Sequence, residues 1–211
     1  MKNNKLNRFL KGYTMVEMLL VLTIISILSV GTMAASVKYT ELTSSLLNDV
    51  NSVTMLIREM QNKTSGFVAS DSVSTPNVGY GIFLDLSSKN KIEPFYKTNT
   101  DTFSIAETLS SKPEQNLLLD SKNSFTRICV NGCSTYSSAT KVAVYFLKPK
   151  SYAVFAIPNP TVPTTYINTI PATGVKINRV CFELTSLNGK HKKRIDIHYV
   201  GQISFASGPC Q

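Results

Sequence analysis

The chain carries an apolar run that is long enough to cross a membrane. Residues 18–37 contain no charged side chain. At about 1.5 Å per residue, a helix of this length spans about 30 Å, which matches the hydrocarbon core of a bilayer. One acidic residue, Glu17, stands directly before the run. A carboxylate near bilayer depth is unfavourable unless it has a partner, so the pattern predicts a membrane-spanning helix whose glutamate needs an explanation.

The hydrophobic pattern continues beyond this run with the period of an amphipathic helix. No Pro or Gly occurs between Thr32 and Ser65, and Gly66 provides a stop signal. We therefore expect one helix of about 50 residues, in preference to two helices that break near Lys38. Its apolar face, Tyr39 included, should pack against the rest of the protein. The residues of this face recur at steps of three and four: Tyr39, Leu42, Leu46, Val50, Val53, Ile57 and Met60.

Beyond Gly66 the helical period is replaced by short runs that alternate apolar and polar residues, which is the pattern of half-buried strands. The last two runs flank Asn188-Gly189, a hairpin signal. The proline-rich segment 157–163 is excluded from a central strand. The pattern predicts an α+β fold, in which a long N-terminal helix packs on an antiparallel sheet. The expected strands are 78–86, 92–96, 125–130, 141–147, 152–157, 175–184 and 194–200.

Charge adds an orientation to this picture. Residues 1–12 hold four basic side chains and no acidic one, so they contribute +4 of the net charge of +9. Basic residues before a membrane span keep that end in the cytoplasm. Everything after residue 37 is therefore expected outside. The remaining +5 is a mild excess that does not by itself indicate nucleic acid as a partner.

The sequence GYTMVE, residues 12–17, followed by an apolar run, resembles the class III signal of type IV pilins and pseudopilins. A basic leader, a glycine, an aromatic residue, a spaced glutamate, an apolar run and an amphipathic extension occur here in that order. The resemblance implies that a prepilin peptidase cuts after Gly12 and methylates the new N-terminus at Tyr13. Glu17 is then the fifth residue of the mature chain. Tyr13 stands where the family more usually has phenylalanine.

The same resemblance implies a division of the chain and a set of partners. Residues 1–12 would be the cleaved leader, 13–37 the transmembrane and filament-core half of the helix, 38–65 its amphipathic half, and 66–211 the β-rich head. The expected partners are other pilin subunits, the prepilin peptidase and the assembly platform in the cytoplasmic membrane. The protein would be a single-pass membrane protein before assembly and part of an extracellular or periplasmic filament afterwards. No cofactor, metal or enzymatic activity is expected.

In the family, the N-terminal amine of one subunit meets the glutamate of a neighbour in the filament. Glu17 would then penalise unassembled or misregistered subunits, because a buried charge is tolerated when it is paired. The alternative is that Glu17 reaches to the cytoplasmic interface, as it would before assembly. Many major pilins carry a proline within the apolar stretch. This chain has none there, and Gly31 is the only comparable weak point.

The final hairpin, which ends near Ser204, resembles the pseudopilins and minor pilins of the H type, and this favours a minor subunit. The alternatives within the class are a major pilin, a type II secretion pseudopilin and a competence pilin that takes up DNA. A hypothesis from another class is an extracellular binding domain for which the helix is only a membrane anchor.

The four cysteines predict disulfides, because the head lies outside the reducing cytosol. A three-residue hairpin loop with Gly132 in the left-handed conformation would set Cys129 directly opposite Cys133, where a bond is feasible. Cys181 and Cys210 remain, and a bond between them would fasten the chain end to the sheet, much as pilins often fasten a C-terminal loop. Four cysteines allow three connectivities, and the sequence leaves them open.

The sequence offers little support for catalysis or for metal binding. Asp196 and His198 share a strand face, with Ser204 nearby, but no nucleophile motif accompanies them. The oxygen-rich segment 98–101 has one acidic residue, Asp101, where calcium usually takes several. We therefore interpret it as an ordinary turn.

A basic run near the Asn188-Gly189 turn is the one candidate for a nucleic-acid contact. Its four formal charges would bind phosphates if they were presented together. The favoured alternative is a solvated hairpin edge, where such residues discourage unwanted strand pairing. The run consists of Lys190, Lys192, Lys193 and Arg194.

Overall fold

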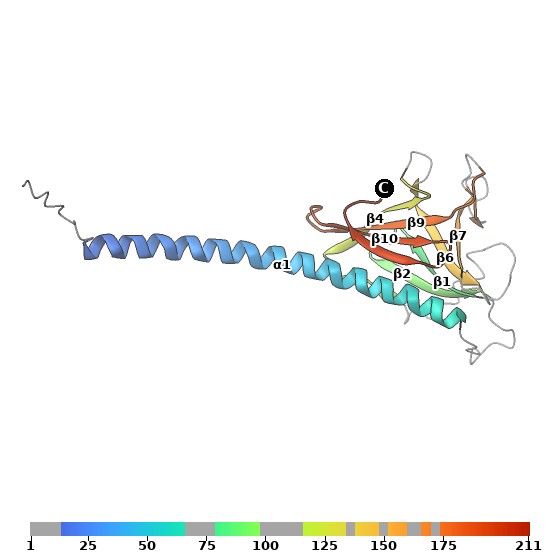
Figure 1. Ribbon diagram of the computed structural model, residues 1–211, viewed down its shortest axis with the longest axis horizontal. Helices are drawn as coiled ribbons and strands as arrows, with labels where there is room; N and C mark the ends of the chain where they lie inside the picture. The colour runs from blue at the N-terminus through green and yellow to red at the C-terminus, as the bar shows by residue number, and fades with distance from the viewer. Residues whose placement is uncertain are drawn as a thin grey trace, which may run out of the picture. The chain divides into compact units, whose positions relative to one another are not determined.

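The computed structural model describes residues 14–65, 79–97, 116–133, 138–147, 152–159, 166–169 and 174–211. Within these ranges it contains one helix, α1 (Met15–Ser65), and antiparallel strands (Figure 1). The predicted α+β fold is confirmed. The chain divides into two compact units, residues 1–41 and 42–211, so α1 contributes to both. The strands are β1 (Gly79–Asp85), β2 (Lys91–Lys97), β3 (Leu117–Leu118), β4 (Asn123–Val130), β5 (Ser138–Ala139), β6 (Lys141–Leu147), β7 (Ala153–Pro158), β8 (Tyr166–Ile167), β9 (Arg179–Ser186), β10 (Lys192–His198) and β11 (Ile203–Ser207).

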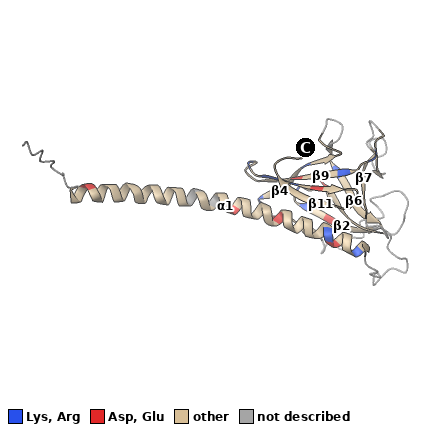
Figure 2. Ribbon diagram, in the orientation of Figure 1, with Lys and Arg blue, Asp and Glu red and all other residues tan. Residues whose placement is uncertain are grey.

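Helix α1 is continuous, as the sequence predicted, and it does not break at Gly31 or near Lys38. Its charge is unevenly distributed (Figure 2): one acidic position lies near the start, an uncharged stretch follows, and the charged positions of both signs lie toward the C-terminal end. The stretch without charge belongs to the first unit, and the part that carries both signs belongs mainly to the second. One helix therefore presents two different surfaces along its length.

The head contains two antiparallel sheets where the sequence predicted one. The first has the strand order β3-β2-β1-β6-β7-β8, and the second has the order β11-β10-β9-β4-β5. The predicted strand 175–184 starts later, at Arg179. The predicted strand 194–200 ends at His198, because Gly201, with a φ of 85°, turns the chain into β11. Strand β11 then pairs with β10 and forms an edge of the second sheet.

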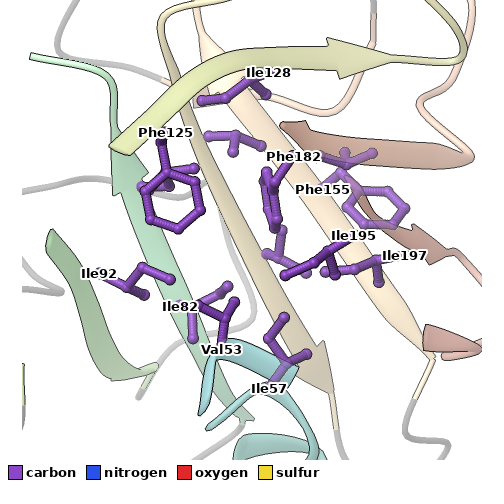
Figure 3. Close-up of a cluster of buried hydrophobic side chains, with 14 of the residues drawn as sticks. Val53, Ile57, Ile82, Ile92, Phe125, Ile128, Phe155, Phe182, Ile195 and Ile197 are labelled. Carbon is purple, nitrogen blue, oxygen red and sulfur yellow. The ribbon is translucent and has the colours of Figure 1, made fainter. Parts of the chain in front are cut away.

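The helix and both sheets share one hydrophobic core (Figure 3). From α1, the side chains of Leu46, Val50, Val53 and Ile57 are fully buried and Met60 is 5% exposed. They meet side chains from both sheets, which include Ile82, Ile92, Phe125, Phe182 and Ile195. The rings of Phe125 on β4 and Phe182 on β9 pack edge to face, with their centroids 6.4 Å apart. Five of the seven predicted core positions on the helix are therefore buried.

The other two positions mark where the core ends. Tyr39 is 60% exposed and belongs to the first unit, so the expectation that it packs against the sheets is wrong. Leu42 is half-buried, and full burial begins at Leu46. Helical periodicity identifies the apolar face of α1, but it does not report how far along that face the sheets extend.

We predict that Ile57→Ala destabilises the head by about 2 to 5 kcal/mol, because it leaves a cavity in the shared core. Denaturant unfolding of the full chain in detergent measures this change. The matched control is Met55→Ala on the same helix, where the side chain is 70% exposed, so the free energy of unfolding should change by less than about 0.5 kcal/mol. Equal effects of the two substitutions would contradict the assigned helix face.

Candidate functional site

The N-terminus of α1 is capped by the residue that precedes it. The backbone N–H of Glu17 donates to the carbonyl oxygen of Thr14 at 3.0 Å and to its hydroxyl at 3.3 Å. The pair has the Thr-x-x-Glu spacing of a capping box. The exposed Glu17 side chain therefore belongs to the first helical turn, where the helix dipole favours a negative charge. This cap was not predicted, although the Thr-x-x-Glu spacing is visible in the sequence. Gly12 and Tyr13 lie outside the described residues.

The first part of α1 has the properties of a membrane span. Met15–Met33 is the one helical stretch, among the residues that the structure describes, that is long and apolar enough to cross a bilayer. None of its window is buried inside the protein. The apolar surface is thus available for lipid or for neighbouring helices, which supports membrane anchoring before assembly.

The serine and threonine hydroxyls of this segment, and those of Ser36 and Thr40 after it, are satisfied within the helix. Each donates to a backbone carbonyl three or four residues earlier, at distances of 2.7 to 2.9 Å. In an apolar environment an unsatisfied polar group would be strongly unfavourable, and this back-bonding removes that penalty. The donors are Thr23, Ser26, Ser29, Thr32, Ser36 and Thr40.

In the head, the C-terminal segment is fastened to β9 by a disulfide and by a buried carboxylate. Cys181 and Cys210 are bonded, with their Cα atoms 5.9 Å apart. The backbone N–H of Cys210 donates to Glu183 at 3.3 Å, and Lys192 and Thr126 donate to the same carboxylate at 2.9 and 3.1 Å. Burial alone would raise the pKa of Glu183, but these donors outweigh it and hold the pKa below its ordinary value. We call residues 208–211, with this bond and carboxylate, the C-terminal clasp.

The basic run lies at the turn and along β10, and most of its charge is engaged within the head. Lys192 pairs with the clasp carboxylate. Lys193, on the opposite face of the strand, donates to a serine hydroxyl of β11 at 2.7 Å. Arg194 pairs with Asp196 at 3.3 Å and donates to a carbonyl of the clasp at 3.2 Å. Lys190 is exposed on the turn. The four side chains are therefore not gathered on one outward surface.

The carboxylate of Asp196 is held by two arginines and is 5% exposed. Arg179 donates to it at 2.6 and 3.0 Å, and Arg194 lies 3.3 Å from its other oxygen. Ser204 is its register partner on β11. This arrangement fastens β9 to β10 through charge pairs, and both carboxylate oxygens have cationic partners, so neither is positioned as the orienting group of a histidine base.

The Cys129–Cys133 bond is present, with a Cα separation of 5.1 Å, but it is not in the expected hairpin. The register pairs Cys129 with Ser138 of β5 on one side and with Cys181 of β9 on the other. Cys133 lies in the loop before β5. The prediction of a three-residue hairpin loop with Cys133 directly opposite Cys129 is therefore wrong.

Asn131 explains the wider loop. Its side-chain amide donates to the carbonyl of Lys176 at 2.8 Å, and its side-chain oxygen accepts from the backbone N–H groups of Asn178 and Arg179 at 2.7 and 3.1 Å. Asn131 adopts a φ of 55°, and Gly132 follows with 111°. These long-range bonds direct the chain toward the segment before β9, a contact that the local sequence does not indicate.

All four cysteines are bonded, and none is free. Their sulfurs form one cluster, in which the Sγ atoms of Cys129, Cys133 and Cys210 lie within 4.8 Å of one another. Bonded sulfurs offer no thiolate to a metal, so this cluster acts as a covalent fastening of the second sheet. The segment 98–101, which we interpreted as a turn, lies outside the described residues.

We predict that Glu183→Gln destabilises the head near pH 7 by about 1 to 3 kcal/mol, because it breaks a buried charged hydrogen-bond network. Since the pKa of Glu183 is lowered in the folded state, its contribution is present above its unfolded pKa and is lost as pH falls below about 4. The variant should therefore lose less stability than the wild type between pH 7 and pH 3, as measured by denaturant unfolding. The control is Glu59→Gln, at an exposed glutamate. If Glu183→Gln loses as much stability as the wild type between pH 7 and pH 3, the role assigned to the Glu183 carboxylate is contradicted.

Comparison with known proteins gives one finding, and it falls on the N-terminus. Residues 10–33 match the family model of the prokaryotic N-terminal methylation motif. No curated protein and no solved structure matches the chain. The motif covers the capped start of α1 and the apolar segment that follows. The chain therefore carries the class III signal of type IV pilins, and this signal supports a type IV pilin-like or pseudopilin subunit.

Proposed function

We propose that the protein is a structural subunit of a type IV pilus-like filament, cut by a prepilin peptidase after Gly12 and methylated on Tyr13. The observation that carries the proposal is the methylation motif at residues 10–33, which runs directly into a 51-residue helix. The first part of this helix is apolar and exposed, and its last part is built into the core of the head. A filament subunit needs both surfaces on one element, because its helix must pack among neighbours while its head stays folded.

Glu17 is proposed to set the axial register of the subunits. In an apolar filament interior a lone carboxylate is strongly penalised, whereas one paired with an amine is tolerated. Cleavage after Gly12 would create such an amine on Tyr13 of a neighbouring subunit. The exposed position of Glu17 in the first helical turn supports a role between subunits.

Within this class we propose a minor pilin, with a type II secretion or competence pseudopilin as the alternative. The apolar segment contains no proline, and the final hairpin resembles the H type. A competence pilin that binds DNA is not favoured, because Lys192, Lys193 and Arg194 have partners within the head.

We predict that the mature protein begins at Tyr13 and carries one added methyl group. Intact-mass and N-terminal peptide analysis of membrane and sheared-surface fractions from the native cells tests this. The modified form in the sheared fraction would support processing and filament incorporation together, and its abundance relative to other pilins would separate a minor subunit from a major one. A chain that starts at Met1, or one that is cut near Ala35, would contradict the proposal and favour an anchored or secreted domain.

We further predict that Glu17→Gln leaves cleavage after Gly12 intact but lowers the amount of protein in the sheared fraction at least about tenfold. The reason is that loss of one partner of a buried charge pair typically costs about 3 to 5 kcal/mol. Glu41→Gln, a change to an exposed glutamate further along the same helix, is the control and should assemble normally. Normal assembly of Glu17→Gln would contradict the role of Glu17 in setting the axial register and would favour a helix that serves only as an anchor.

A further inference from the structure

The two disulfides of the head are close enough to exchange with each other. The Sγ atoms of Cys129, Cys133 and Cys210 lie within 4.8 Å of one another, although Cys210 is bonded to Cys181 and not to the other two. Cys129 and Cys181 are also direct register partners on neighbouring strands. Thiol–disulfide exchange requires a thiolate to reach a bonded sulfur, and here each bond lies beside sulfurs of the other bond.

Access from solvent is unequal among the four cysteines. Cys129, Cys181 and Cys210 are 1%, 2% and 4% exposed, whereas Cys133 is only half-buried. An external oxidant can therefore approach Cys133, while both cysteines of the Cys181–Cys210 bond are buried. The hydrogen bond from the backbone N–H of Cys210 to Glu183 holds this cysteine over β9. Folding of the clasp therefore buries Cys181 and Cys210, the two cysteines that must still be oxidised, away from solvent.

We propose that Cys129 and Cys133 act as an internal shuttle, which takes a disulfide from an external thiol oxidant at Cys133 and passes it to Cys181 and Cys210. The co-reactant is a protein or small molecule that carries a reactive disulfide. The shuttle goes beyond the role in filament assembly and does not depend on it. It makes Cys133 the docking cysteine through which both bonds of the head are formed.

The steps balance as thiol–disulfide exchanges. The Cys133 thiolate attacks the oxidant and expels one of its sulfurs as a thiolate. The Cys129 thiolate then attacks Cys133, closes Cys129–Cys133 and expels the oxidant's second thiolate. Two electrons pass to the oxidant, and the expelled thiolates take up the protons that the attacking cysteines lost.

Transfer inside the head follows the same chemistry. The Cys210 thiolate attacks the sulfur of Cys129, forms Cys129–Cys210 and expels the thiolate of Cys133. The Cys181 thiolate then attacks Cys210, forms Cys181–Cys210 and expels the thiolate of Cys129. This regenerates the Cys129 and Cys133 dithiol, and a second oxidant disulfide closes it. Two oxidant disulfides thus yield two protein disulfides.

The first experiment follows the order of bond formation. Full-length protein in detergent is reduced, freed of reductant, re-oxidised with oxidised glutathione and trapped by alkylation for peptide mapping. We expect Cys129–Cys133 to form first and Cys129–Cys210 to appear transiently. In Cys133→Ser, closure of Cys181–Cys210 should slow by about tenfold or more, because an intramolecular delivery step is lost. Equal closure rates in the wild type and in Cys133→Ser would overturn the proposal.

A second experiment uses the native, fully oxidised protein and needs no variant. Limiting reduced glutathione is added, and new thiols are alkylated and mapped. Attack at Cys133 frees Cys129, which should then capture Cys210. The expected products carry glutathione on Cys133 and the alkyl label either on Cys129 or, after capture of Cys210, on Cys181 together with a Cys129–Cys210 bond. A label that stays on Cys129 alone, with no Cys129–Cys210 bond at any delay before alkylation, would show that the two bonds do not exchange and would overturn the shuttle.

Discussion

The contact on which the head depends is the packing of one face of α1 into a hydrophobic core that it shares with both sheets. Four fully buried side chains of α1, from Leu46 to Ile57, stand in the same core as the aromatic pair Phe125 and Phe182. Dispersion and the removal of apolar surface from water are the main favourable terms in such a core. In the structure the two sheets meet in this core together with the helix, so loss of the helical face would leave apolar surface of both sheets uncovered.

The second organising constraint is the satisfaction of polar groups in two different surroundings. In the apolar half of α1 the serine and threonine hydroxyls bond to carbonyls of the same helix, because a hydrocarbon environment supplies no other hydrogen-bond partner. In the head, Glu183 and Asp196 are buried on the second sheet, and each has a cationic partner on the neighbouring strand. Asp196 has a second one, Arg194, on its own strand. Isolated buried charges would be strongly unfavourable. The polar layer of β9 and β10 therefore holds the chain end by charge and by a covalent bond together.

Much of this architecture could be predicted from the sequence, because it is encoded locally. The helix follows from an apolar run, a period of three and four, and the lack of Pro or Gly between Thr32 and Ser65. The strands follow from alternation and turn residues. What could not be predicted depends on contacts between distant segments. The bonds from Asn131 to the segment before β9 widen the loop that was expected to be a tight hairpin. Lys192 likewise finds its partner on the neighbouring strand β9, and Arg194 bonds to a carbonyl of the chain end, so a basic run that looked like one patch is divided between two faces of β10.

The internal bonding of hydroxyls along the apolar segment has a consequence for the choice of neighbours in the filament that we propose. Because the serine and threonine hydroxyls from Thr23 to Thr40 donate to their own helix, those hydrogens are not offered to a particular residue on an adjacent helix. In that filament, selection along this segment would then rest on shape and on the charge that we propose for Glu17 in assembly. A helix of this kind can exchange one neighbour for another of similar outline, and this is the property that a filament built from more than one kind of subunit requires.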